Sequence, residues 1–337
     1  MQSSHESDLE QTARRAIESA RQTWGADWAP TRAAIAPGRI EILGNHVDYN
    51  GGPVLAAAVD RATVVLSDDS DELAVLFADF PNTGVEIIDL SISDLTPASP
   101  GAPLASDFLL GTIARSRSKE RQLRIGRSVI ATSVPIGSGM SSSAALSVAL
   151  SLLLNDVPPH GAELVYDAQA AENWTGVPCG TMDQAASVFG QVIRYEGPEG
   201  TNSVAPDLGD YCFVVVNSRV ERTLGTSSYP IRVRECAEAV QMLEARWNRP
   251  VGNLAAVSLE DLDSLDPTVL AFPLDARVRH IVTEIDRVAS GEAAMQARDW
   301  ETFGALMNAS GESSARDYAI SHPLVEALVA AMRPKRN

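Results

Sequence analysis

The sequence contains very little lysine, and this excludes several common phosphate sites. Lys119 and Lys335 are its two lysines, and neither follows a glycine. The P-loop that ends in Gly-Lys-Ser/Thr is therefore absent, and so is the strand lysine of protein kinases. No Gly-x-Gly-x-x-Gly opens a helix after an expected strand, which excludes the dinucleotide-binding fingerprint. A phosphate site in this chain must use backbone amides, hydroxyls, arginine or a metal ion.

Cysteine and basic charge are also scarce. Cys179, Cys212 and Cys236 show no Cys-x-x-Cys spacing, which argues against structural zinc and is typical of a reducing compartment. The formal net charge of −17 argues against nucleic acid and anionic membranes as partners, because both need a basic face. No apolar run approaches membrane-spanning length, and the polar start does not resemble a signal peptide. The composition predicts a soluble, cytoplasmic protein.

The 337 residues, 45% of them hydrophobic, are enough for a large core and for two domains. Helical and strand patterns are interleaved without strict alternation, which predicts an α+β fold with mixed, mostly antiparallel sheets. The Gly/Pro/Asn-rich stretch 197–209 predicts a boundary between domains 1–205 and 206–337. Expected strands are 33–43 (broken at Pro37-Gly38), 54–66, 73–77, 84–90, 124–133, 189–195 and 211–218. Expected helices are 8–24, 106–117, 142–154, 161–175, 230–247, 276–290, 293–308 and 322–332.

The most informative segment is Val134-Pro-Ile-Gly-Ser-Gly-Met-Ser-Ser-Ser-Ala-Ala145. Its two glycines permit a tight turn close to a ligand, and an apolar helix follows at once. Unpaired backbone N–H groups and the helix dipole at such a point attract a phosphate. The alternative is an ordinary serine N-cap, which needs one hydroxyl and no glycine turn. The expected phosphate-binding residues are Pro135, Gly137, Ser138, Gly139, Met140, Ser141, Ser142 and Ser143.

A second polar segment follows Arg39 at the end of an expected strand. Within six residues it contains Asn45, His46, Asp48, Tyr49 and Asn50, and it closes on two glycines. Donors and acceptors in this mixture suit sugar hydroxyls. A solvated turn is the alternative, since Asn-Gly-Gly is a common turn ending. We call residues 44–52 the sugar loop.

Two carboxylates stand out further along the chain. Asp183 lies in Cys179-Gly-Thr-Met-Asp-Gln184, among small and apolar residues where an unpaired charge is costly. Glu172 ends an expected helix eleven residues earlier and could bind magnesium, which takes one or two carboxylates together with phosphate oxygens. Taken singly, Asp183 is better explained as a surface aspartate at a helix start, and Glu172 as a solvated helix residue.

Together these segments resemble the GHMP small-molecule kinases, and specifically their galactokinase branch. The segment from Pro37 to Gly52, which includes Arg39 and the sugar loop, matches the branch's Gly-Arg…Leu-Gly…His-x-Asp-Tyr-Asn-Gly-Gly signature. The serine-glycine segment matches its ATP phosphate loop, and Cys-Gly-Thr-Met-Asp-Gln matches its catalytic loop. Val215-Val-Asn-Ser218 and Tyr229-Pro-Ile-Arg-Val-Arg-Glu-Cys236 are similar to segments that complete the sugar pocket. Leu306-Met-Asn-Ala-Ser-Gly-Glu-Ser-Ser314 is similar to a late helix of the branch. The resemblance covers about residues 30 to 330.

The resemblance implies a two-domain sugar 1-kinase, active as a monomer, with its active site between the domains. Asp183 would orient or deprotonate the anomeric hydroxyl of galactose, and Arg39 would offset charge on the transferring phosphoryl group. ATP would bind on residues 135–143, and Ser143 with Glu172 would hold Mg²⁺. The sugar hydroxyls would be bound by Asn45, His46, Asp48, Gly180 and Tyr229.

Two departures from the family pattern keep alternatives open. Asn45 stands where the galactose enzymes have Glu, and an amide also tolerates a carboxylate at C6 of the sugar. Galacturonate, or arabinose with no C6 group, is therefore an alternative substrate. The chain also has no glycine after Gly311 and lacks the family's late glycine-rich motif. A shortened relative that binds sugar and nucleotide with impaired catalysis is the second alternative.

Overall fold

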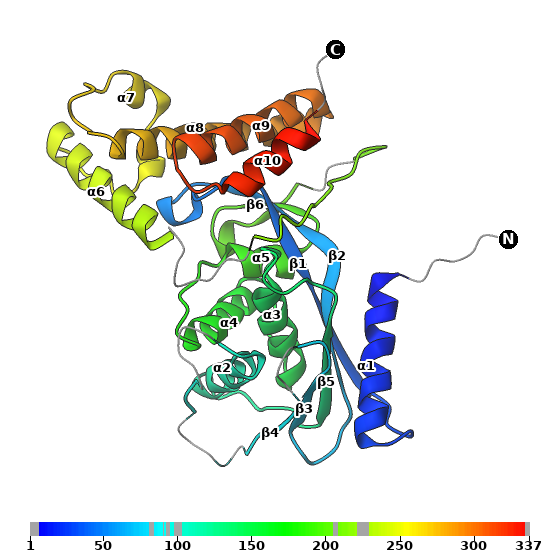
Figure 1. The fold of residues 1–337 in the computed structure, drawn as a ribbon. Coiled ribbons are helices and arrows are strands. Elements are labelled where there is room, and N and C mark those ends of the chain that lie inside the picture. The colour runs from blue at the N-terminus through cyan, green and yellow to red at the C-terminus, as the bar shows by residue number, and fades with distance from the viewer. Residues whose placement is uncertain are drawn as a thin grey trace. The chain divides into compact units, whose positions relative to one another are not determined.

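The computed structural model describes residues 7–80, 84–89, 91, 95–97, 103–204, 208–220 and 229–333. The chain forms two compact units (Figure 1). The first comprises Met1–Ile40 with Ala57–Gln191, and the second comprises Glu41–Ala56 with Val192–Asn337. The sugar loop thus belongs to the unit that holds the C-terminal half. The boundary expected between residues 205 and 206 lies outside the described residues and stays a prediction.

A mixed sheet forms the centre of the first unit. Its strands pair in the order β4-β3-β5-β2, with β1 also paired to β2. The β2–β5 and β3–β4 pairs are antiparallel, whereas β3 and β5 are parallel. The strands are β1 (Arg32–Leu43), β2 (Val54–Ser67), β3 (Ala74–Phe77), β4 (Val85–Ile87) and β5 (Arg127–Thr132).

Helices cover both faces of this sheet, which explains its nearly continuous apolar strands. Successive strand residues point to opposite faces. Val64 and Leu66 accordingly pack with Ala16, Ala20 and Trp28 beside α1 (Asp8–Trp24). Val65 joins the larger core on the other face, to which α2 (Ala105–Ser118), α3 (Ser142–Leu154) and α4 (Gly161–Trp174) contribute (Figure 1). Helix α3 is apolar on all sides, as expected for a buried helix.

The second unit is mainly helical. The short strands β6 (Val192–Tyr195) and β7 (Asn202–Ser203) of this unit pair antiparallel. Its helices are α6 (Tyr229–Trp247), α7 (Leu259–Asp263), α8 (Leu274–Ala297), α9 (Trp300–Arg316) and α10 (Pro323–Met332), with single 3₁₀ turns at Asp48–Asn50, Pro198–Gly200 and Leu254–Ala256. No helix among the described residues combines the length and the apolar character that crossing a membrane requires.

The α+β class is confirmed, but several element predictions are wrong. Strand β1 continues through Pro37, whose carbonyl accepts the Ser187 hydroxyl at 2.7 Å. Residues 211–218 form no strand, because no described strand pairs with this segment. Val214 within it is 72% exposed. Helix α8 does not end near Gly291: a Cβ there would lie 2.5 Å from Leu43 Cδ1, so the glycine permits close packing. The break lies instead at Arg298, which adopts a left-handed conformation.

Candidate active site

Asp183 and Arg39 form an ion pair in the first unit. Asp183 lies in the first turn of α5 (Met182–Phe189), a short helix that the sequence patterns did not predict. Arg39 Nε donates to Asp183 Oδ1 at 2.7 Å, and Nη2 lies 2.5 Å from the same oxygen. The Ser141 hydroxyl donates to Oδ2 at 2.5 Å. Both carboxylate oxygens are therefore held, and the positive end of the α5 dipole favours the negative charge.

Arg39 also joins this carboxylate to the serine-glycine loop. Its Nη1 donates to the Gly139 carbonyl at 2.6 Å, and its backbone N–H donates to the Met140 carbonyl at 3.1 Å. The loop approaches β1 closely, since a Cβ on Gly38 would lie 2.7 Å from the Met140 oxygen. One arginine thus fixes Asp183 relative to the loop expected to hold phosphate. Its planar guanidinium suits this double role, because it donates in several directions at once.

The serine-glycine loop has the backbone conformation that its glycines predict. Gly137 (φ 73°) and Gly139 (φ 82°) are left-handed, and a Cβ on either would meet no atom within 4 Å. Packing therefore does not require glycine at these positions. The left-handed backbone conformation favours glycine there, and the space beside each residue is open. Pro135, Gly137, Ser138, Gly139, Met140 and Ser141 lie in the loop between β5 and α3, and Ser142 and Ser143 lie in the first turn of α3. The amides that begin α3 suit an anion.

Glu172, near the end of α4, is buried beside the same loop. Its Oε2 accepts a hydrogen bond from Gln184 Nε2 at 2.7 Å, and the Ser143 hydroxyl bonds to its side chain. Burial raises the pKa of Glu172, and the nearby Asp183 carboxylate raises it further. The Ser143 hydroxyl and the buried Glu172 carboxylate are oxygen ligands of the kind that a hard divalent cation takes. Among the described residues, no three or more His, Cys, Asp or Glu side chains are arranged to bind a metal ion, so a cation here would take further ligands from phosphate or water.

The sugar loop in the second unit brings the predicted substrate residues together. His46 is left-handed (φ 63°), and its carbonyl accepts a hydrogen bond from Asn50 Nδ2 at 3.0 Å. His46 Nδ1 lies 3.0 Å from Tyr49 Oη, which lies 2.7 Å from Tyr318 Oη. The Tyr229 ring lies 5.6 Å from the His46 ring and 5.2 Å from the Tyr49 ring. Burial raises the pKa of both Tyr49 and Tyr318, so these hydroxyls keep their protons.

Of the remaining predicted sugar-binding residues, Asn45 and Asp48 lie in the sugar loop and Gly180 lies in the first unit. Asn45 is half-buried, and its Oδ1 is buried without a hydrogen-bond partner. Asp48 begins the 3₁₀ turn of the sugar loop. Gly180 belongs to the first unit, in the loop that precedes α5. Tyr318 was missed by the sequence interpretation, because it follows α9 outside every recognised motif.

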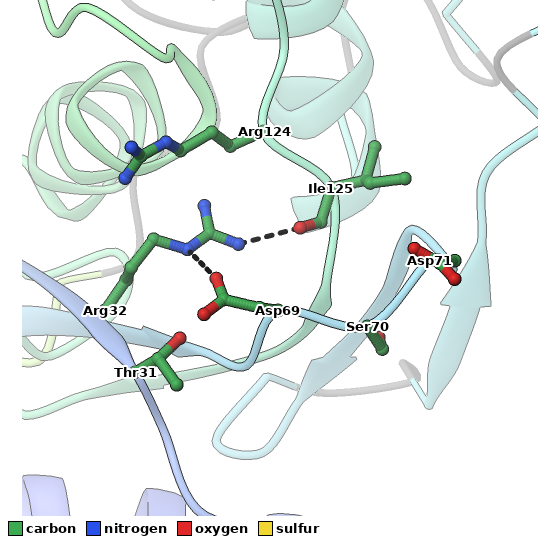
Figure 2. Close-up of a pocket in the computed structure, with 7 residues that line it drawn as sticks. All are labelled: Thr31, Arg32, Asp69, Ser70, Asp71, Arg124 and Ile125. Atoms are coloured by element: carbon green, nitrogen blue, oxygen red, sulfur yellow. Dashed lines mark hydrogen bonds and ion pairs between the residues drawn. The ribbon is translucent and has the colours of Figure 1, made fainter.

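A surface pocket of about 410 Å³ in the first unit contains none of the predicted site residues. Figure 2 shows Arg32 at its centre, with Nε donating to Asp69 and Nη2 donating to the Ile125 carbonyl at 2.7 Å. Arg32 Nη2 also donates to the Asp68 carbonyl at 2.9 Å. The guanidinium is thus committed to partners within the protein.

Comparison with known proteins identifies the family of this chain. The galactokinase galactose-binding signature matches residues 21–67, which include Arg39 and the sugar loop. The N-terminal domain of the GHMP kinases matches residues 109–191, which include the serine-glycine loop, Glu172 and Asp183. A galactokinase of Roseiflexus sp. is 37% identical over 303 residues, covering 87% of this chain and 75% of the relative. The chain belongs to the galactokinase family.

Further relatives support this assignment and the fold. Human galactokinase is 34% identical over 334 residues, covering 95% of this chain and 81% of the relative. The structure of Lactococcus lactis galactokinase complexed with galactose matches with a TM-score of 0.83 at 28% identity, covering 95% of this chain and 83% of that chain. Methanococcus jannaschii mevalonate kinase, at 13% identity and a TM-score of 0.59, shares the fold. The chain is a galactokinase-like sugar kinase with a GHMP kinase fold, and its family implies the use of ATP.

Proposed function

We propose that this chain transfers the γ-phosphoryl group of ATP to the anomeric hydroxyl of galactose, giving galactose 1-phosphate and ADP. The observation that carries the proposal is the Arg39–Asp183 pair beside the serine-glycine loop. It provides a carboxylate for a hydroxyl nucleophile and a fixed positive charge within one unit. The galactose-binding signature over residues 21–67 supports galactose as the sugar.

Asp183 orients the anomeric hydroxyl and accepts its proton as the oxygen–phosphorus bond forms and the bond to the β-phosphate oxygen breaks. Phosphoryl transfer passes through a loose transition state, so position and charge matter more than strong basicity. Arg39 supports both requirements, because it holds Asp183 and places positive charge beside the loop. The hydrogen bond from Ser141 fixes the second carboxylate oxygen.

Residues 135–143 bind the phosphates of ATP through backbone amides and hydroxyls, and Ser143 with Glu172 would hold Mg²⁺. When bound, Mg²⁺ would neutralise negative charge on the phosphates. The Ser143 hydroxyl bonded to the buried Glu172 side chain supports a cation at this position, because Mg²⁺ takes oxygen ligands, including carboxylates. The described residues give the nucleotide amides and hydroxyls rather than a lysine.

Asn45, His46, Asp48, Gly180 and Tyr229 bind the sugar hydroxyls. Asn45 Oδ1 is a buried acceptor without a partner, and the 6-hydroxyl of galactose is a donor that would satisfy it. Galacturonate is the second candidate, since the same amide with its NH₂ turned inward would donate to a carboxylate. Arabinose is the third, because it lacks the C6 group.

We also propose that the enzyme acts as a monomer and that the reaction takes place in the cytoplasm. Three free cysteines suit a reducing compartment. Sedimentation analysis of the purified protein tests the monomer, and a single species near the chain mass of 35.9 kDa is expected.

The decisive experiment measures ATP consumption with galactose, galacturonate, arabinose and glucose, each with and without Mg²⁺. We expect Mg²⁺-dependent turnover that is fastest with galactose. Asp183→Asn should reduce kcat at least about a thousandfold while nucleotide binding persists. A folded wild-type protein that binds ATP but phosphorylates none of these sugars would overturn the proposal and favour a sugar-binding relative without catalysis.

A further inference from the structure

Helix α8 holds the backbone of Asn45 from both sides of the residue. Glu284 Oε1 accepts the backbone N–H of Gly44 at 2.9 Å and that of Asn45 at 3.3 Å. His280 Nε2 lies 3.0 Å from the Asn45 carbonyl oxygen. His280 and Glu284 are four residues apart, so they lie on one face of the helix, and both are completely buried.

Glu284 is itself fixed by groups outside the sugar loop. Arg287 Nε donates to its Oε2 at 2.6 Å, and the Ser310 hydroxyl of α9 donates to its Oε1 at 2.6 Å. Burial alone would raise the pKa of Glu284, but Arg287 and the hydrogen bonds outweigh burial and lower it. The carboxylate therefore stays ionised and is a strong acceptor for the two loop amides.

The His280 side chain is also held by groups outside the sugar loop. Its Nδ1 lies 2.9 Å from the Ser313 hydroxyl, and its ring lies 4.4 Å from the Tyr318 ring at an interplanar angle of 31°. The Asn45 carbonyl can only accept, so Nε2 carries a proton. The Ser313 hydroxyl lies between Nδ1 and the Asp317 carboxylate, to whose Oδ2 it donates at 3.1 Å. Burial lowers the pKa of His280, which favours the neutral form of the ring. Tyr318 in turn bonds to Tyr49, the partner of His46.

We propose that Glu284 and His280 are positioning residues that set the geometry of the sugar loop, an inference that rests on the proposed sugar kinase function. Burying an ionised carboxylate and an imidazole is costly, and an apolar helix face would pack against a loop without that cost. What the two polar groups add is a fixed position for the Asn45 peptide units. The Asn45 amide and, through Tyr318 and Tyr49, the His46 ring are then held for the sugar before it binds.

Steady-state kinetics of three substitutions test this inference. For Glu284→Gln and His280→Ala we expect the KM for galactose to rise about tenfold, with the KM for ATP unchanged and kcat within about threefold. His280→Gln keeps a donor for the Asn45 carbonyl and should recover most of the loss. The control is Asp299→Ala, which removes the N-cap of α9, where Asp299 accepts the Thr302 N–H at 3.0 Å. It should lower the melting temperature and leave the galactose KM unchanged.

The outcomes separate this inference from the proposed function. If the wild-type protein does not phosphorylate galactose, the proposed function is wrong and the inference fails with it. If the wild type is active and the His280 and Glu284 variants fold but keep the wild-type galactose KM, the inference alone is wrong. A rise in both KM values that Asp299→Ala reproduces would also overturn it, since this would reflect general destabilisation of the unit. Should Glu284→Gln fail to fold, the contrast between His280→Ala and His280→Gln decides.

Discussion

Arg39 and Asp183, which are 144 residues apart in the chain, meet at 2.7 Å between Nε and Oδ1. The pair joins β1 to the first turn of α5, and the same guanidinium reaches the Gly139 carbonyl. Its geometry makes Arg39 the link between the carboxylate expected at the sugar and the loop expected at the phosphates.

Replacement of Arg39 by lysine is expected to lower kcat about a hundredfold. A lysine keeps the charge, but a single ammonium cannot reproduce the planar set of donors that reaches Asp183 and Gly139 together. Arg15→Lys is the matched control, because Arg15 pairs with Asp79 at 3.2 Å in the same unit without contacting the site. Initial rates at saturating galactose and ATP measure the effect. Equal rates for the two variants would contradict the role given to Arg39.

Loss of the Ser141 hydroxyl should lower kcat about tenfold, because it removes a hydrogen bond to a charged oxygen of Asp183. Ser141 is left-handed (φ 54°), so Ser141→Gly relieves strain while Ser141→Ala keeps it. We expect both variants to lose the same activity and the glycine variant to be the more stable. If the glycine variant is both more stable and more active than the alanine variant, Ser141 acts only through the loop conformation and not through its hydroxyl.

Much of the fold could be predicted from hydrophobic periodicity and turn residues. Helices α1, α3 and α4 carry long patterns that tertiary contacts reinforce, and their bounds agree with prediction within about one residue. Helix α5 was missed because it has eight residues, and its stability comes from buried Met182, Ala185 and Ala186 instead of length. The strand expected at 211–218 had the right composition, but a strand also needs a partner, which local sequence does not report.

The candidate site could be predicted as segments but not as contacts. The motifs selected Asp183, Arg39 and the sugar loop, whereas the Ser141–Asp183 bond depends on a left-handed backbone that no motif specifies. His280 and Glu284 fall in a predicted helix, where charged residues usually face solvent. They are buried because they bond to backbone groups of the sugar loop far earlier in the chain: His280 bonds to the Asn45 carbonyl, 235 residues away, and Glu284 accepts the Gly44 N–H, 240 residues away. Only the three-dimensional structure reveals such long-range partners.

Asp68 links stability to pH in the first unit. Burial raises the pKa of Asp68, but the Arg127 backbone N–H and guanidinium, with Ser70, outweigh burial and lower it. An Asp with a lowered folded-state pKa contributes stability above its unfolded value, about 3.9, and loses it as the pH falls through the folded-state pKa. Asp68→Asn should therefore cost about 2 kcal/mol at pH 7, and the difference from wild type should shrink below about pH 4.

Denaturant unfolding of the wild type and Asp68→Asn at several pH values measures this dependence. Asp69→Asn is the control, since Asp69 is exposed and pairs with Arg32 at 3.1 Å at the surface. Its cost should stay within about 0.5 kcal/mol at every pH. A constant difference between Asp68→Asn and wild type from pH 7 to pH 3 would contradict the assignment.

Asn45→Asp tests how the C6 group of the sugar is selected. Aspartate has nearly the size of asparagine, so the change adds a negative charge and removes the NH₂ donor while an acceptor for the galactose 6-hydroxyl remains. Galacturonate carries a carboxylate at C6, which the new charge would repel. We expect the ratio of kcat/KM for galactose to that for galacturonate to rise at least about tenfold, mainly through loss of galacturonate turnover. Kinetics with both sugars at fixed ATP measure the ratio. An unchanged ratio would mean that Asn45 does not face C6, and the unpaired Oδ1 would then have to be satisfied by another hydroxyl of the sugar.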